Sequence, residues 1–99
     1  MSGDGDQRVL PPSFVALHVP VGRTRPTLGR DELLARHELC EDLANALAER
    51  ASAVKWETGA DESEVLRRVA RGLEGGGGAG LADAESRWVL QRLAEILGW

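Results

Sequence analysis

The feature that most constrains this chain is a stripe of apolar and small residues that repeats between residues 33 and 54. It advances by alternating steps of four and three, as one face of an α-helix does. Its members are Leu33, His37, Cys40, Ala44, Leu47, Ala51 and Val54. We predict a helix over residues 31–56, with Asp31 or Thr27 as its N-cap and the Gly59 turn as its end. A stripe this long needs other helices to cover it.

A capping signal predicts a second helix over residues 61–74. Asp61 and Glu64 have the spacing of a capping box, in which Asp61 accepts the amide of Glu64 and Glu64 reaches back. The apolar residues that follow share one face: Val65, Leu66, Val69, Ala70 and Leu73. The basic residues Arg67, Arg68 and Arg71 fall on the opposite face.

A glycine-rich stretch over residues 75–80 predicts a flexible linker, because it has no side chain able to bury anything. A third helix is predicted over residues 83–97, with Gly98 as its stop. Trp88, Arg92 and Trp99 share one edge of that helix, with the arginine able to stack on Trp88. The predicted fold is therefore all-α, a small three-helix bundle spanning residues 31–99.

Residues 1–30 are predicted to form a flexible or extended N-terminal arm. Prolines bound the segment Phe14–Val21, and proline favours extended backbone in the residue before it. A lone strand cannot form a sheet, so we expect this segment to dock on the helices, pair with a second copy or wait for a partner. Its apolar members are Phe14, Val15, Leu17 and Val19.

Charge and composition narrow the classes of partner. The net charge is −4, so the chain has no general attraction for nucleic acid or an anionic membrane. The longest apolar run, Phe14–Leu17, is far too short to cross a bilayer. With a single cysteine and no secretion signal, a cytoplasmic location is expected. The Arg-rich, Lys-poor composition is attributed to a GC-rich genome. The closing pattern, with residues 64–68, 80–81 and 88–93, resembles short bacterial proteins in composition, but no motif identifies a family.

His37, Cys40 and Glu41 lie at the spacing of metal ligands on one helical turn. A zinc-protease helix needs a second histidine where this chain has Glu41, and His18 is the only further ligand for a structural zinc site. We expect Cys40 to be a buried apolar residue and His37 a hydrogen-bonded one, with no metal or cofactor. A thiol on a packed face is inert, so no catalytic residue is assigned and the chain is not expected to be an enzyme.

The sequence thus predicts a protein-binding or regulatory module that associates with another protein or with itself, as a homodimer. The expected contacts are Trp88, Arg92 and Trp99, together with Phe14, Val15, Leu17 and Val19. The alternative is a helix-turn-helix-like DNA-binding regulator, because the Thr58–Ala60 turn has a suitable length and glycine. Acidic residues at the start of the second helix would face phosphates and oppose that role.

Overall fold

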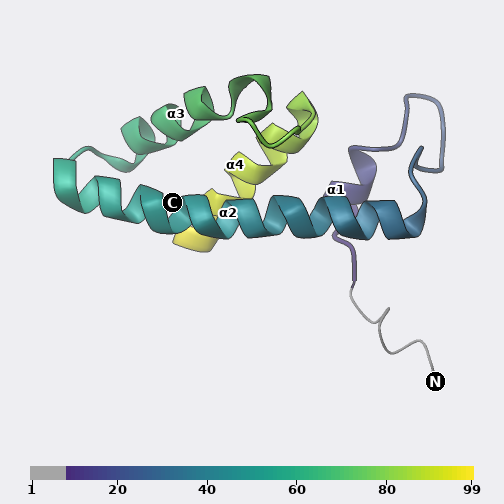
Figure 1. The fold of residues 1–99 in the computed structure, drawn as a ribbon, viewed down its shortest axis with the longest axis horizontal. Helices are drawn as coiled ribbons and strands as arrows, with labels where there is room; N and C mark the ends of the chain where they lie inside the picture. The colour runs from purple at the N-terminus through teal and green to yellow at the C-terminus, as the bar shows by residue number, and fades with distance from the viewer. Residues whose placement is uncertain (1–8) are drawn as a thin grey trace. The chain divides into compact units, whose positions relative to one another are not determined.

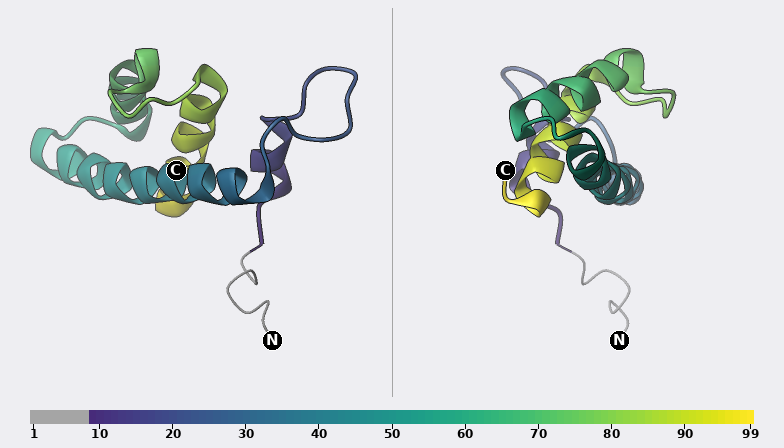
Figure 2. Two further views of the ribbon diagram at one scale, coloured as in Figure 1. Left: turned by 45° about the vertical axis from the view of Figure 1, so that its right-hand side comes forward. Right: turned by 90° about the vertical axis from the view of Figure 1, so that its left-hand side faces the viewer.

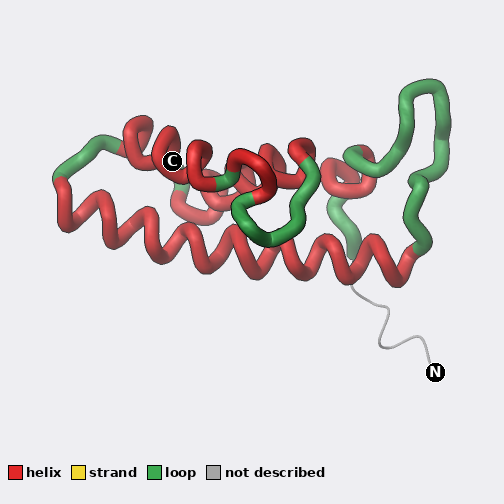
Figure 3. Tube along the Cα trace, turned by 45° about the horizontal axis from the view of Figure 1, so that its top comes forward, coloured by secondary structure: helices red, strands yellow, loops and turns green. Residues whose placement is uncertain are grey.

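The computed structural model describes residues 9–99, and all its regular elements are helical (Figure 3). They are α1 (Pro12–Ala16), α2 (Arg30–Thr58), α3 (Glu62–Gly72), the short 3-10 helix η2 (Glu74–Gly76) and α4 (Asp83–Leu97). Within this described range there is no strand. The all-α prediction is confirmed, and the three long helices begin and end within two residues of their predicted bounds. The part of the predicted arm over residues 1–8 lies outside the described residues.

The chain divides into two compact units. The first ends at His37, and the second runs from Glu38 to Trp99. Helix α2 is continuous through the division. The predicted domain boundary after residue 30 stays a prediction.

In the first unit, part of the segment predicted to be extended is helical. Pro12 occupies the first position of α1, where its missing N–H costs no helical hydrogen bond. Pro11 has the extended conformation of an N-cap residue, and its carbonyl accepts the amides of Phe14 at 3.0 Å and Val15 at 3.1 Å. The two prolines therefore start a helical turn here, and the prediction that they bound an extended segment over residues 14–21 is wrong for residues 14–16.

Phe14 anchors the core of this first unit. Its side chain is fully buried, and its ring lies 5.4 Å from the rings of His18 and His37, measured between centroids. Leu33 and Leu34, at the start of α2, are buried as well. After α1, the chain is closed into a loop by Thr27, whose amide donates to the carbonyl of His18 at 2.8 Å.

In the second unit, α3 runs back along the later part of α2, and α4 crosses that part of α2 (Figures 1 and 2). The backbones come closest between α3 and α4 and between α4 and η2. The buried apolar side chains are Cys40, Ala44, Ala48, Ala51, Val65, Leu73, Leu81, Val89 and Leu93. Leu47 and Val54, which the predicted stripe placed in the core, are only half-buried.

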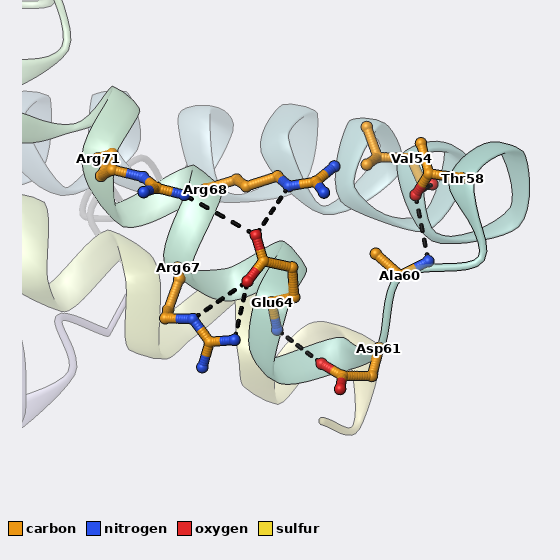
Figure 4. Close-up of polar contacts among 8 residues, drawn as sticks. All are labelled: Val54, Thr58, Ala60, Asp61, Glu64, Arg67, Arg68 and Arg71. Carbon is orange, nitrogen blue, oxygen red and sulfur yellow. Dashed lines mark hydrogen bonds and ion pairs between the residues drawn. The ribbon is translucent and has the colours of Figure 1, made fainter.

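Local signals set the helix ends of the second unit. Asp61 Oδ1 accepts the amide of Glu64 at 2.8 Å, as predicted for the start of α3 (Figure 4). Ala82, before α4, has no side-chain acceptor, but its amide donates to Glu85 Oε1 at 3.0 Å. Gly98 ends α4 as predicted, in the left-handed conformation with a φ of 72° that glycine adopts without strain.

We expect the fully buried Leu93 to be a main contributor to stability. Replacing Leu93 with alanine should lower the free energy of unfolding by about 2–5 kcal/mol, because it empties a packed site. Urea denaturation followed by circular dichroism measures this loss. The matched control is Ile96→Ala on the same helix, where the side chain is 36% exposed and the loss should be much smaller. Equal losses would contradict this assignment of the core.

Candidate protein-binding surfaces

An apolar groove of about 330 Å³ lies between α2 and α3. We call it the α2–α3 groove. Its lining residues are Leu43, Leu47, Arg50, Ala51, Val54, Val65, Arg68, Val69, Gly72, Leu73 and Gly77. Val65, Leu73 and Ala51 form its buried floor, whereas Leu47 and Val69 are half-buried and accessible. The groove therefore presents apolar side chains that the chain itself leaves partly uncovered.

The groove is open because no residue of α4 lines it. Helix α4 is engaged elsewhere, packing closely on α3 and η2 and pairing with α2 through Arg92 and Glu41. At one end of the groove, Gly77 has a φ of 60°, and a Cβ there would lie 3.3 Å from the carbonyl oxygen of Gly72. A larger residue would strain that turn, so one residue of the predicted linker also shapes the groove.

The charged side chains that line the groove are both arginines. Arg50 on α2 is exposed and makes no ion pair within residues 9–99. Arg68 on α3 donates to Glu64 Oε2 at 3.1 Å. No aspartate or glutamate is among the lining residues. The groove thus combines apolar walls with a basic rim.

Glu64 is shared by three arginines on α3 (Figure 4). The Arg67 and Arg68 guanidinium groups lie 2.8 and 3.1 Å from its carboxylate oxygens, and that of Arg71 lies 3.8 Å away. The hydrogen bonds from Arg67 and Arg68 lower the pKa of Glu64 below its ordinary value of 4.5. Glu64 therefore does not reach back to the N-cap as the capping box predicted, and one carboxylate leaves the cluster with an excess of positive charge.

The predicted tryptophan edge of α4 lies close to α2. Arg92 holds Glu41 in a two-point ion pair, with Nε to Oε1 at 2.8 Å and Nη2 to Oε2 at 2.9 Å. These bonds raise the pKa of Arg92. The predicted stacking partner for this arginine was Trp88, but its guanidinium faces Glu41, because a carboxylate offers it charge-assisted hydrogen bonds that a ring does not.

Lys55 lies over the ring of Trp99. Its Nζ lies 5.5 Å from the ring centroid of Trp99 and 2.8 Å from Glu62 Oε2 on α3. Trp88 and Trp99 are both half-buried, whereas Trp56 on α2 is 84% exposed. Two members of the predicted edge thus contact α2 of the same chain, and the role of this edge in binding a partner stays a prediction.

The predicted contacts from the arm belong to the first unit, and the tryptophan edge belongs to the second. Phe14 is fully buried, and Val15, Leu17 and Val19 are half-buried. The segment was expected to dock on the helices, and Phe14 does so, because its ring packs against that of His37 on α2. Binding of a partner by these four residues stays a prediction.

The residues weighed as metal ligands have other surroundings. Cys40 is fully buried, His37 packs edge-on against Phe14, and Glu41 pairs with Arg92. Across residues 9–99, no group of three histidine, cysteine or acidic side chains is placed to hold a metal ion. None of the helices in the same range is both long and apolar enough to cross a membrane.

Sequence reasoning missed the α2–α3 groove, although its signal was present. Leu43, Leu47, Arg50 and Val54 repeat with steps of four, three and four along one edge of the predicted stripe, to which Leu47 and Val54 themselves belong. Periodicity alone could not show that this edge of the stripe would lack a covering helix.

Comparisons of the chain with protein-family models, with curated proteins and with solved structures found no match. Its function is therefore inferred from its own residues.

The ion pairs of Glu64 predict a pH-dependent contribution to stability. Because the folded-state pKa lies below 4.5, this contribution is present above about pH 4.5 and is lost as the pH falls through the folded-state pKa. We expect Glu64→Gln to unfold at lower urea concentration than the native chain at neutral pH, with the difference vanishing in strong acid. Glu49→Gln, which replaces an exposed carboxylate without an ion pair in the described part of the chain, should show no comparable difference. A pH-independent effect of Glu64→Gln would contradict this role.

The pair between Arg92 and Glu41 should couple α4 to α2. A double-mutant cycle with Arg92→Ala and Glu41→Ala should give a coupling energy of about 0.5–1 kcal/mol, because both side chains are partly shielded and the contact has two points. The control is the same cycle with Glu95, which lies 3.4 Å from Arg92 and is 58% exposed. Coupling to Glu95 that equals or exceeds coupling to Glu41 would contradict the assignment.

Proposed function

We propose that this chain is a small non-enzymatic module that acts by protein–protein association, with the α2–α3 groove as its binding site. The observation that supports this proposal is the set of half-buried apolar side chains along the groove, Leu43, Leu47, Val54 and Val69. Exposed apolar surface of this kind, bordered by charged residues, is typical of interaction sites. A regulatory role and a cytoplasmic location are parts of the same proposal.

The proposed occupant is a segment of another protein rather than a second copy of the chain. A two-fold pairing of two grooves would bring the same patch of each copy together, so Arg50 and Arg68 would approach their own counterparts. Like charges brought together oppose association. The experiment must therefore distinguish the homodimer predicted from the sequence from a complex with another protein.

Position-specific photo-crosslinking in the native cell tests this proposal. Benzoylphenylalanine replaces Val69 in the groove, or Arg87 on the exposed face of α4 as the matched control. We expect a discrete crosslink to another protein from position 69 and none from position 87. Equal crosslinking from both positions, or none from position 69, would overturn the proposal. A crosslink to a second copy of the chain would show self-association and overturn the proposal that the partner is another protein.

The DNA-binding alternative makes a different prediction. Its basic residues would be Arg67, Arg68 and Arg71, which share the Glu64 carboxylate and are partly neutralised by it. Salt-sensitive retention on heparin that is lost in the Arg67→Ala, Arg71→Ala double variant would favour a nucleic-acid partner and count against the proposed function.

A further inference from the structure

We infer that the α2–α3 groove receives an amphipathic helix with acidic residues along its flanks, supplied by a partner protein. This inference rests on the proposed function and names the chemistry of the partner. Two independent observations carry it: the spacing of the residues along both walls, and the sign of the charge on the rim.

The spacing of the lining residues fits a helix. On α2 they stand at 43, 47, 50, 51 and 54, and on α3 at 65, 68, 69 and 72. Both walls thus repeat every three to four residues, which is the periodicity with which side chains of a third helix would interdigitate. The α2 wall from Leu43 to Val54 spans about 16 Å at 1.5 Å per residue, or roughly three helical turns.

The charge on the rim favours an acidic partner. Arg50 on one wall has no acid to pair with in the described part of the chain, and Arg68 on the other competes with Arg67 and Arg71 for Glu64. Carboxylates on the flanks of a bound helix would offer both rim arginines charge-assisted hydrogen bonds. A basic helix would meet repulsion from both walls. The charge of the groove is opposite in sign to the net charge of −4 on the whole chain.

The experiment uses the full chain and three synthetic helical peptides that share one leucine-rich face. Their flanking positions carry glutamate, glutamine or lysine, and binding is followed by fluorescence anisotropy of a label on the peptide. We expect the glutamate peptide to bind most tightly, the glutamine peptide next and the lysine peptide least. Added salt should weaken binding of the glutamate peptide far more than that of the glutamine peptide.

Charge reversal on the rim assigns the effect to named residues. Arg50→Glu should weaken binding of the glutamate peptide roughly fivefold or more and strengthen binding of the lysine peptide, because the rim charge at position 50 changes sign. Arg87→Glu makes the same charge change outside the groove and should leave the order of the three peptides unaltered. Leu47→Ser should weaken all three peptides alike, since it alters the apolar wall and no charge. Circular dichroism checks that each variant keeps the helical content of the native chain.

The outcomes separate this inference from the proposed function. Equal binding of the three peptides, weakened alike by Leu47→Ser, would overturn the acidic preference and leave the groove as a helix-binding site. Tighter binding of the lysine peptide would overturn the preference as well. No binding of any peptide would overturn both the inference and the proposed function. An effect of Arg87→Glu equal to that of Arg50→Glu would also overturn the inference, because the preference would then come from overall charge.

Discussion

A single helix, α4, serves as the cover for the later part of α2 and for α3. A helix covers another with only one face, and α4 uses its buried residues Val89 and Leu93 in the core of the second unit. The residues of α2 that this core buries are small, notably Ala44 and Ala48, and bury little apolar area. The larger side chains on the neighbouring face of α2, such as Leu47, are left beside the groove. The groove is thus the face that three helices of this composition leave uncovered.

Arginine has two distinct uses on this framework. Arg92 fixes α4 to α2 by reaching Glu41 from a partly shielded position, where a two-point contact restrains both helices. On α3 the arginines outnumber their carboxylate, so Glu64 holds them in place and neutralises them only in part. The first arrangement stabilises the fold, and the second keeps positive charge beside the groove. In a chain of net negative charge, this local excess is the feature from which we infer the acidic preference of the proposed binding site.

For several residues the sequence gives a clear local signal, but the surroundings that it predicts differ from those in the structure. Pro11 and Pro12 predict the boundary of an extended segment, but proline also fits the first turn of a helix, and the burial of Phe14 accompanies the helix. Glu64 was correctly placed three residues after its N-cap, but Arg67 and Arg68 offer its carboxylate stronger partners than a backbone amide. Val54 had the periodicity of a core residue and lies beside the groove. In each case the contacts of the residue depend on neighbouring side chains that the sequence pattern does not specify.

The sequence by itself determined the helical class, the ends of the three long helices and the cap at Asp61. These depend on interactions between residues a few positions apart, namely the period of apolar side chains, the Asp61 acceptor before α3, and Gly59 and Gly98 after α2 and α4. Only the tertiary structure decided that Arg92 meets Glu41, that Lys55 lies over Trp99 and that Leu47 and Val69 face an open groove. Those outcomes depend on how α4 crosses α2, and a helical seam carries no information about which neighbour will cover it.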